Sequence, residues 1–380
     1  MKNFKFLTLF LLLAAAVACR KDDVVFVPEV IPTGPPEFTS VEGFYLLNEG
    51  NMGSNKSTLD YYDYTRGEYL RNIYGNANPE VPKELGDVGN DLKIYGSRLY
   101  AVINCSNKVE VMNAADARRI GQVDIPNCRS IDFDGRFAYV TSYAGPVEIN
   151  PDYQQKGFVA KVDTATLEVV GRCVVGFQPD GLAITGGKIY VANSGGYRVP
   201  NYEKTVSVID LKSFTLEGEF EVAENLQYIV EDSQRRLWIS TRGDYYDQTS
   251  RIFCYDPEAK RLVKDLDVPV NGLWVDGDSI YTVANGWSYE TMSEMISYAI
   301  IDTRRMEKVC DNFISDGSEK QITRPYGVAV NPLTKEIYVT DARTYVNPGY
   351  LYCFSPDGRQ KWRVRTGDIP AHFAFKGTLK

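Results

Sequence analysis

Seven short apolar segments along this chain each carry a tyrosine or tryptophan at the same position. The seven aromatic residues are Tyr45, Tyr100, Tyr139, Tyr190, Trp238, Tyr281 and Tyr338. Their separations run from 39 residues, between Tyr100 and Tyr139, to 57 residues, between Tyr281 and Tyr338. Recurrence at this spacing indicates one structural unit built seven times, which is the pattern of a repeat protein.

The repeated unit consists of four short strands. In the fullest copy they are Pro179–Ile184, Lys188–Asn193, Val206–Asp210 and Gly218–Val222, which are alternating or β-branched segments separated by turn residues. This pattern is typical of a four-stranded antiparallel sheet. A period of about 40 to 55 residues is that of a propeller blade, whereas a helical solenoid needs a 3.6-residue periodicity. The sequence therefore predicts an all-β, seven-bladed β-propeller.

The first copy lacks its innermost strand, because no such segment precedes Gly43–Asn48. The missing pattern stands at the other end of the chain, where Pro370–Ala374 repeats the pattern of Pro179–Ala183 and Pro325–Ala329. We expect the C-terminal strand to complete the blade that the N-terminal strands begin. This pairing closes the ring and protects the sheet edges.

The third strand ends in Asp or Asn in six of the seven copies. These residues are Asp63, Asn113, Asp163, Asp210, Asp256 and Asp302. They suggest a ring of carboxylates for calcium or for acid–base chemistry. However, a turn follows each of them, and short acidic or amide side chains commonly bond the backbone two residues further on. We therefore predict that they cap turns.

The N-terminus has the features of a lipoprotein signal. Residues 1–18 combine lysines with an apolar run that is too short to span a membrane. Ala16–Cys19 resembles a bacterial lipobox, in which the cysteine is lipidated, and the alternative is a plain signal peptide with an incidental cysteine. Arg20–Asp23 is similar to the surface-export signal of lipoproteins in Gram-negative gut anaerobes. The expected location is the cell surface, on the outer membrane, with the lipid on Cys19.

The chain after this signal divides into a tether and one domain. Residues 19–37 contain the lipidated cysteine and a proline-rich segment with few charges, which we expect to be an extended tether. Residues 38–380 are expected to form the propeller, which is long for an average domain but normal for this class.

Charge and residue spacing exclude several classes of ligand. The formal net charge is −8, and it becomes −10 once Lys2 and Lys5 leave with the signal peptide. Without a basic run, nucleic acid is not an expected partner. No Cys/His spacing typical of a metal site is present in the sequence, so no metal is predicted.

The remaining cysteines include two pairs of interest. Cys254 and Cys353 occupy the same place in two different blades, so we predict that they are small buried hydrophobic residues. Cys105 and Cys128 lie near neighbouring turns, and the sequence leaves both a disulfide and two free thiols open.

Long aromatic insertions follow the second strands of several copies. In a propeller these loops open on the same face as the segments that enter the first strands, so insertions there build one shared surface. The aromatic residues are Tyr143, Tyr153, Tyr197, Tyr202, Tyr245, Tyr246, Trp287, Tyr289 and Tyr345. Tyrosine and tryptophan at this density favour a recognition surface. The alternative is that the loops simply pack onto one another.

A second ring of candidates lies at the start of the first strands, closer to the axis. It consists of Asn90, Arg129, Asp180, Gln227, Asn271 and Tyr326. These mostly neutral side chains are suited to hydrogen bonding a polar ligand, although Asp180 and Arg129 can instead pair with each other. His372, the one histidine, sits in the closing strand at the position of Gly181 and Gly327. A structural role near the channel mouth and a ligand contact both remain open for it.

The chain as a whole resembles the YncE-like propellers of surface lipoproteins, and closely the BtuG-type family that binds vitamin B12. The resemblance covers the lipobox, the export signal Cys19–Asp23, the tether and all seven copies, from Phe44–Gly50 to Pro370–Phe375. It implies capture of cobalamin and related corrinoids, with transfer to a TonB-dependent outer-membrane transporter in a lid-like complex. It implies neither an enzyme nor a cofactor, because cobalamin is the transported ligand. Cobalt ligation by His372 is not required.

Two other hypotheses belong to different classes. A lid or scaffold on a transporter for glycans or peptides would carry the same export signal and the same aromatic rim. A lactonase or lyase of the propeller kind would need carboxylates and amides on the axis, for which Asp180, Asn90 and Asn271 are the candidate set. We expect a binding protein rather than an enzyme, because one axial carboxylate is thin support for catalysis.

A cysteine substitution tests the lipid anchor. Replacing Cys19 with Ala removes the sulfur that carries the lipid, so the variant should lose acylation and partition into the aqueous phase of a detergent extraction. Cys105→Ala is the matched control and should remain acylated. An acylated Cys19→Ala variant would contradict the lipobox prediction.

Overall fold

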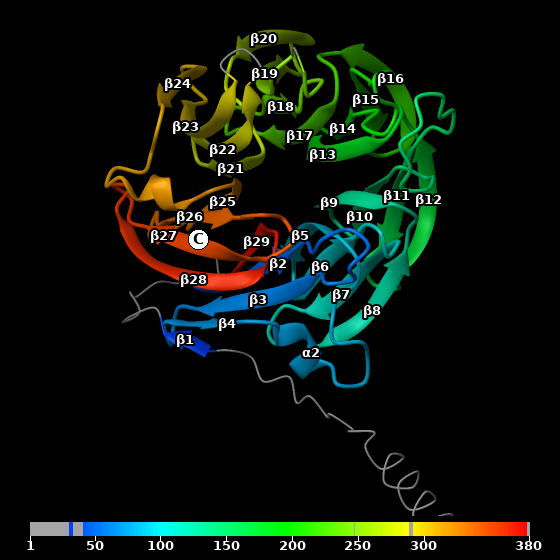
Figure 1. Cartoon of the computed structure of the whole chain (residues 1–380). Coiled ribbons are helices and arrows are strands. Elements are labelled where there is room, and N and C mark those ends of the chain that lie inside the picture. Colours follow the sequence, from blue (N-terminus) through cyan, green and yellow to red (C-terminus); the bar gives the residue numbers. More distant parts are fainter. Residues whose placement is uncertain (1–29, 33–40, 247, 289–291, 378–380) are drawn as a thin grey trace, which may run out of the picture.

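The strands form seven antiparallel sheets placed around a central axis, with the chain running once around the ring (Figure 1). This computed structural model describes residues 30–32, 41–246, 248–288 and 292–377. Six of the sheets have four strands each, in simple sequence order from the axis outward. The predicted seven-bladed β-propeller is confirmed.

Blades two to seven repeat the same meander from the axis outward. Blade two has β5 (Gly89–Tyr95), β6 (Arg98–Ile103), β7 (Lys108–Asn113) and β8 (Arg119–Asp124). Blade three has β9 (Cys128–Asp134), β10 (Phe137–Ser142), β11 (Phe158–Asp163) and β12 (Glu168–Val174). Blade four has β13 (Pro179–Thr185), β14 (Lys188–Asn193), β15 (Thr205–Asp210) and β16 (Thr215–Glu221).

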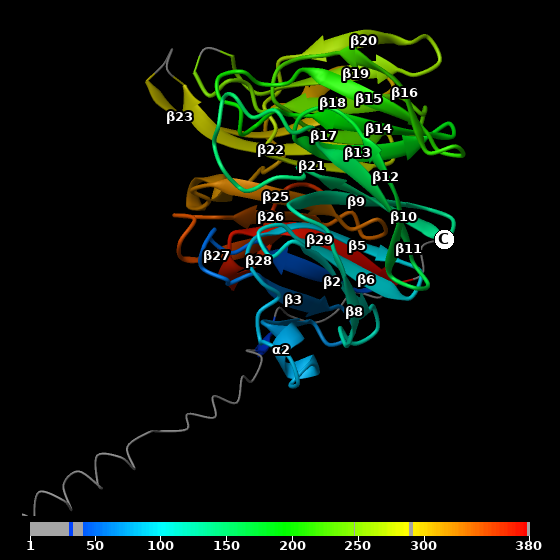
Figure 2. The ribbon, with the colours of Figure 1, turned by 90° about the vertical axis from the view of Figure 1, so that its right-hand side faces the viewer.

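The second half of the ring continues the meander. Blade five has β17 (Leu226–Glu231), β18 (Leu237–Thr241), β19 (Arg251–Asp256) and β20 (Arg261–Leu266). Blade six has β21 (Gly272–Asp276), β22 (Ser279–Ser288), β23 (Ser293–Asp302) and β24 (Glu307–Cys310). Blade seven has β25 (Pro325–Val330), β26 (Ile337–Asp341), β27 (Pro348–Phe354) and β28 (Gln360–Asp368). The β22–β23 hairpin reaches beyond the other blades (Figure 2).

Blade one joins the two ends of the chain. Its strands β2 (Val41–Asn48), β3 (Thr58–Asp63) and β4 (Glu68–Leu70) are completed at the axis by β29 (Pro370–Gly377). In the antiparallel register of β2 and β29, Tyr45 lies opposite Ala374. The closing strand predicted from the C-terminal pattern is therefore confirmed.

A fifth strand lies on the outer edge of blade one. β1 (Val30–Pro32) pairs antiparallel with β4, so that Val30 lies opposite Leu70. β1 falls within the segment expected to form the tether, and it covers an edge that would otherwise be open. The described residues also contain two short helices: α2 (Ile73–Ala77) between β4 and β5, and the 3-10 helix η1 (Ser318–Gln321) between β24 and β25.

The repeated aromatic residues lie in the packed layers between blades. Six of the seven are buried, and Tyr281 is half-buried. Buried polar atoms of such side chains need hydrogen-bond partners. The Tyr45 hydroxyl donates to the Ala114 carbonyl of the next blade at 2.9 Å, and Trp238 Nε1 donates to Asp232 Oδ2 at 2.9 Å. These aromatics are therefore scaffold.

The acidic residues at the ends of the third strands cap turns, as predicted. Asp163 Oδ1 accepts from the Ala165 backbone N–H at 2.9 Å, and Asp256 Oδ1 accepts from that of Glu258 at 2.9 Å. Asp210 Oδ1 likewise accepts from the Ser213 N–H at 2.7 Å. They lie away from the axis and form no ring.

The cysteines among the described residues are free thiols. Cys254 and Cys353 are fully buried, as predicted. Cys105 and Cys128, for which the sequence left two states open, form no disulfide. Cys128 contacts the Lys108 carbonyl at 3.3 Å, and burial raises its pKa to about 12, so it is an inert interior thiol.

In five blades, the residue before the innermost strand has a left-handed backbone conformation, with positive φ, and turns the chain toward the axis. These residues are Val88, Asn127, Gln178, Asn225 and Ile369, with φ between 43° and 58°. Each carbonyl accepts a hydrogen bond from the residue that follows the second strand of its blade, as in Arg242 to Asn225 at 2.9 Å. This repeated bond joins the two loop systems on one face and fixes the residues that surround the axis.

No helix in the part of the chain that the structure describes is long and apolar enough to cross a bilayer. The predicted signal peptide 1–18, Cys19 and Arg20–Asp23 lie outside the described residues.

A tryptophan substitution measures how much the interblade layer contributes. Trp238 is 0% exposed, so Trp238→Ala should lower the free energy of unfolding by about 3 to 5 kcal/mol through lost burial and a residual cavity. Leu216→Ala is the control, because Leu216 is 45% exposed on an outer strand, and it should change stability by less than about 0.5 kcal/mol. Equal losses in urea unfolding would contradict the assignment of Trp238 to the core.

Candidate functional site

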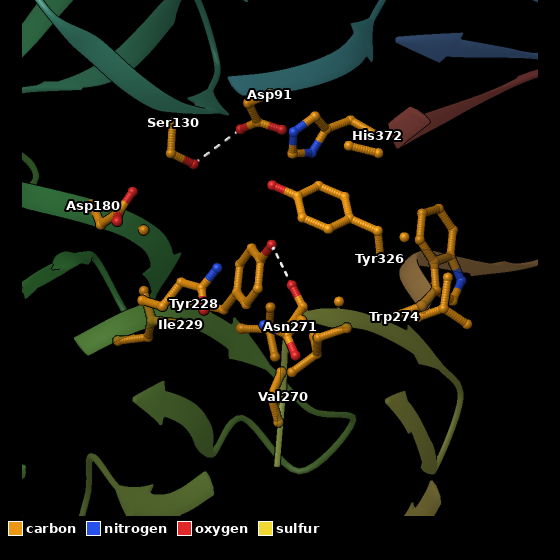
Figure 3. A pocket seen from close by; sticks show the side chains of 18 of the residues that line it. Asp91, Ser130, Asp180, Tyr228, Ile229, Val270, Asn271, Trp274, Tyr326 and His372 are labelled. Atoms are coloured by element: carbon orange, nitrogen blue, oxygen red, sulfur yellow. Dashed lines mark hydrogen bonds between the residues drawn. The ribbon is translucent and has the colours of Figure 1, made fainter. Parts of the chain in front are cut away.

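A large cavity lies on the axis, where the innermost strands meet. Its volume is ≈ 1370 Å³, which exceeds the roughly 300 to 1,000 Å³ of common small-molecule pockets. Each blade contributes a polar side chain to its wall, in or just before the innermost strand: Asn90, Arg129, Asp180, Gln227, Asn271, Tyr326 and His372. Figure 3 shows several of the lining side chains arranged around this space: Asp180, Tyr228, Asn271, Tyr326 and His372. The inner ring predicted from the strand starts is therefore brought together.

Two arginines converge on one buried aspartate in this wall. Arg129 Nε lies 3.3 Å from Asp180 Oδ1, and Arg242 Nη2 lies 2.6 Å from Asp180 Oδ2. Arg129 Nη1 also donates to Asn90 Oδ1 at 3.1 Å. The pairing of Arg129 with Asp180, which the sequence left open, is thus present together with a second arginine.

The charges in this cluster stabilise one another. Burial raises the pKa of the Asp180 carboxyl, but the attraction of Arg129 and Arg242 outweighs it and holds the pKa below the ordinary value. Burial also acts to lower the pKa of Arg129, whereas Tyr143 and Asp180 raise it, and the net shift is upward. Asp180 is therefore ionised at neutral pH and held by two cations, which leaves it unsuited to act as a general base.

Tyr143 and Tyr197 support this cluster from behind. Tyr143 is only 3% exposed, and its hydroxyl donates to Asp180 Oδ2 at 3.2 Å. The Arg129 guanidinium lies 4.7 Å from the centre of its ring, and Tyr197 packs edge-on against it at 5.3 Å. The sequence pattern predicts both tyrosines on the open rim, but the structure places them behind the wall, because the buried ion cluster needs a hydroxyl donor and an aromatic face.

A second cluster lies on the opposite part of the wall. Glu49 Oε1 is 3.1 Å from His372 Nε2, and the Tyr326 hydroxyl donates to Glu49 Oε2 at 3.0 Å. The ring of Tyr326 meets that of Tyr345 edge-on at 6.0 Å, and the Tyr345 hydroxyl donates to Asn285 Oδ1 at 3.1 Å. His372 therefore lines the cavity with one ring nitrogen already engaged by a carboxylate.

Neutral polar groups lie between the two charged clusters. The Tyr228 hydroxyl donates to the Asn271 carbonyl at 3.0 Å, as the dashed line in Figure 3 marks. Asn271 Oδ1 accepts from the Asn285 backbone N–H at 2.6 Å. Gln227 Oε1 is buried and, among the residues that the structure describes, has no hydrogen-bond partner. A buried acceptor without a donor costs roughly 1 to 3 kcal/mol, which a ligand N–H can recover.

The predicted aromatic rim is only partly assembled around the cavity. Tyr245, Tyr246 and Tyr345 line it, and the first two are more than half exposed. Tyr153, in the β10–β11 loop, and Tyr202, in the β14–β15 loop, do not line the cavity. The Tyr153 hydroxyl donates to Gln155 Oε1 at 3.3 Å, and the Tyr202 hydroxyl is buried.

Two predicted aromatics come from the long hairpin of blade six. Trp287 is in β22, where it pairs with Glu294, but its side chain lies outside the described residues. Tyr289 also lies outside them.

Two charged residues of the site were not predicted from the sequence, because only aromatic residues were selected in the loops that follow the second strands. Glu49 and Arg242 each stand immediately after a second strand, at the position that Tyr143 occupies in blade three. Their backbone N–H groups make the same hydrogen bond, to the carbonyls of Ile369 and Asn225. The signal that could have found them is therefore their position in the repeat.

The loops around the mouth expose several apolar side chains. Met52, Ile149, Met292 and Val346, from four different second-to-third-strand loops, are each more than half exposed. Large apolar side chains gathered on one exposed face are typical of an interaction surface. Across residues 41–246, 248–288 and 292–377, by contrast, no group of three His, Cys, Asp or Glu side chains is placed to hold a metal ion.

Fold and site together define a seven-bladed β-propeller with a polar cavity on its axis. Residues 42–356 match the family described as Domain of unknown function (DUF5074), and the chain belongs to that family. No curated protein matches the sequence.

Several solved structures share the fold at low sequence identity. A quinonprotein alcohol dehydrogenase-like protein from Bacteroides thetaiotaomicron is 14% identical with a TM-score of 0.56, over 89% of this chain and 79% of that chain. Hydrazine synthase from Kuenenia stuttgartiensis is 16% identical with a TM-score of 0.55, over 71% and 77%. The WD40 domain of Neurospora crassa Pan2 is 10% identical with a TM-score of 0.52, over 77% and 80%. These similarities show the propeller fold alone.

Neutralising the central aspartate tests the ion cluster. Asp180→Asn leaves two arginines without their counter-ion, so the free energy of unfolding at pH 7 should fall by about 3 kcal/mol. Because the native pKa of Asp180 is lowered, its stabilising effect is present above the unfolded pKa of about 3.9 and is lost as the pH falls. The difference between wild type and variant should therefore shrink between pH 5 and pH 3.

The control for this test is Asp256→Asn, since Asn still accepts the turn hydrogen bond at that half-buried position. Its stability should stay within about 0.5 kcal/mol of wild type. A loss for Asp180→Asn that does not change with pH would contradict an ionised, arginine-bound Asp180.

Proposed function

We propose that this protein is a cell-surface lipoprotein that binds cobalamin and related corrinoids and passes them to a TonB-dependent outer-membrane transporter. The observation that carries the proposal is the axial cavity of ≈ 1370 Å³, whose wall combines amides and hydroxyls with tyrosine at its mouth. A corrin ring is wide, fringed with amides and apolar at its methylated edges. Both its polar and its apolar parts therefore have partners in this cavity.

Four amide side chains of the cavity wall are candidate partners for the amides of a corrin ring. Asn90, Gln227, Asn271 and Asn285 line the cavity, and amide side chains both donate and accept hydrogen bonds. The unpaired Gln227 Oε1 offers an acceptor to an incoming amide N–H. These neutral groups lie beside the charged clusters, so the wall offers hydrogen-bond partners to a large ligand whose edge is mostly uncharged.

The tyrosines supply the apolar contact. Tyr345 is held by its hydrogen bond to Asn285 and by its edge contact with Tyr326, so it presents its ring with little freedom to lose on binding. Tyr245 and Tyr246 extend the same wall outward into solvent. One held aromatic and two exposed ones, all lining the same cavity, support binding of a broad flat ligand.

Transfer to a membrane partner is supported by two features. The lipobox-like Ala16–Cys19 and the export-like Arg20–Asp23 favour the outer face of the outer membrane. The exposed Met52, Ile149, Met292 and Val346 belong to second-to-third-strand loops, which open on the same face as the cavity mouth, and a transporter that receives the ligand would dock on this face. Ligand and transporter would then meet the propeller on the same face. A binding role also agrees with an Asp180 that is held by two arginines.

Calorimetry with cyanocobalamin tests the proposal on the chain from Arg20 onward. One equivalent should bind, and Tyr345→Ala should weaken binding by about 2 kcal/mol, roughly 30-fold, because a buried aromatic contact is lost. Tyr95→Ala is the matched control, since Tyr95 bonds the Gly135 carbonyl in the first-to-second-strand turns, which open on the opposite face. Absence of heat at micromolar wild-type protein would end the proposal, and full affinity of Tyr345→Ala would move the site elsewhere.

A further inference from the structure

We propose that Arg129 and Arg242 form a subsite for a single phosphodiester group of the bound ligand. The inference rests on the proposed function and makes it more specific. On a complete corrinoid, the phosphodiester that links the ring to its nucleotide base is the anionic group, whereas the side chains of the ring are neutral amides. The subsite would therefore distinguish complete corrinoids from those that lack the nucleotide loop.

The cluster around Asp180 carries excess positive charge. Two guanidinium groups share the single carboxylate of Asp180, which leaves one positive charge in excess. Glu49 and Asp91 also line the cavity and keep their negative charge, but they contact other groups: Glu49 contacts His372 and Tyr326, and Asp91 contacts the Ser130 hydroxyl at 2.9 Å. Among the described residues, both arginines form their ion pairs with Asp180. An excess buried charge is costly unless a counter-ion reaches it. A ligand group with one negative charge, in contact with both guanidinium groups, would balance the charge of this cluster.

The two guanidinium groups have more N–H donors than their protein partners use. A guanidinium has five N–H groups. Among the described residues, Arg129 donates to Asp180 and Asn90, while Arg242 donates to Asp180 and to the Leu226 carbonyl. Each side chain therefore keeps N–H groups for a ligand, and both arginines line the cavity. Paired guanidinium donors match the oxygen geometry of phosphate better than a point charge does.

Both arginines are held in place before a ligand binds. The Arg129 guanidinium lies over the Tyr143 ring at 4.7 Å, and the backbone N–H of Arg242 is bound to the Asn225 carbonyl at 2.9 Å. Asp180 holds both guanidinium groups through its two carboxylate oxygens. Little conformational freedom is left to lose when an anion arrives, which favours affinity.

Calorimetry with two ligands tests the subsite on the chain from Arg20 onward. Cyanocobalamin carries the phosphodiester, whereas dicyanocobinamide has the same amide-fringed ring without it. Arg242→Gln should weaken cyanocobalamin binding about ten- to hundredfold, as expected for a lost hydrogen bond to a charged group. The same variant should change dicyanocobinamide binding by less than about threefold. It leaves the Asp180–Arg129 pair balanced, so its thermal unfolding should resemble wild type.

Two further variants complete the design. Arg198→Gln removes the same charge from the same face but outside the cavity, where Arg198 stacks on Phe177 at 4.0 Å, and it should affect both ligands equally little. If Arg242→Gln does not fold, Arg129→Gln replaces it, because Asp180 then keeps Arg242 as its partner. The same selective loss of cyanocobalamin binding is expected.

The outcomes separate the two proposals. If wild type binds both ligands and the arginine variants weaken both by the same factor, or weaken neither, the phosphodiester subsite is wrong and corrinoid binding stands. If wild type binds neither ligand, corrinoid binding itself fails and the subsite fails with it. If the arginine variants lose affinity for cyanocobalamin alone, the result supports both corrinoid binding and the phosphodiester subsite.

Discussion

The whole structure depends on the packing of each blade against the next, and this packing is complete only because β29 pairs with β2. A single four-stranded sheet cannot bury both of its faces, so each blade needs two neighbours. The innermost strands approach so closely that a Cβ atom on Gly327 would lie 2.2 Å from the Ala371 carbonyl oxygen. Ring closure thus brings seven sequence-distant strands to one axis, and the cavity is a consequence of it.

The walls of that cavity show how a regular scaffold carries an irregular site. Before five of the innermost strands, the same left-handed backbone conformation recurs, and the carbonyl of that residue accepts the same hydrogen bond each time. Two positions later the side chain differs in each blade, for example Asn90, Arg129, Asp180 and Gln227. The repeated backbone keeps these positions facing the axis, so their chemistry can vary without disturbing the fold. One side of the wall becomes cationic around Asp180, and another carries Glu49 with His372.

The fold alone assigns no function, because hydrazine synthase and the Pan2 WD40 domain share it at 16% and 10% identity. The cavity carries the functional argument. Its volume favours a large ligand, its amides favour a neutral polar edge, and its two arginines favour one anionic group. Together, these three properties support the proposal of a corrinoid ligand.

The sequence by itself determined the seven-fold repeat, the closing strand, the turn caps and the inner ring, because each depends on a local pattern that repeats along the chain. Only the tertiary structure decided which side chains meet. Arg242 and Asp180 are 62 residues apart, and Glu49 and His372 are 323 apart. It also placed Tyr143 behind the wall and left Cys105 and Cys128 unpaired. Arg242 and Asp180 meet because two neighbouring blades pack together, and Glu49 and His372 meet because one blade is built from both ends of the chain. A local pattern carries no information about such contacts.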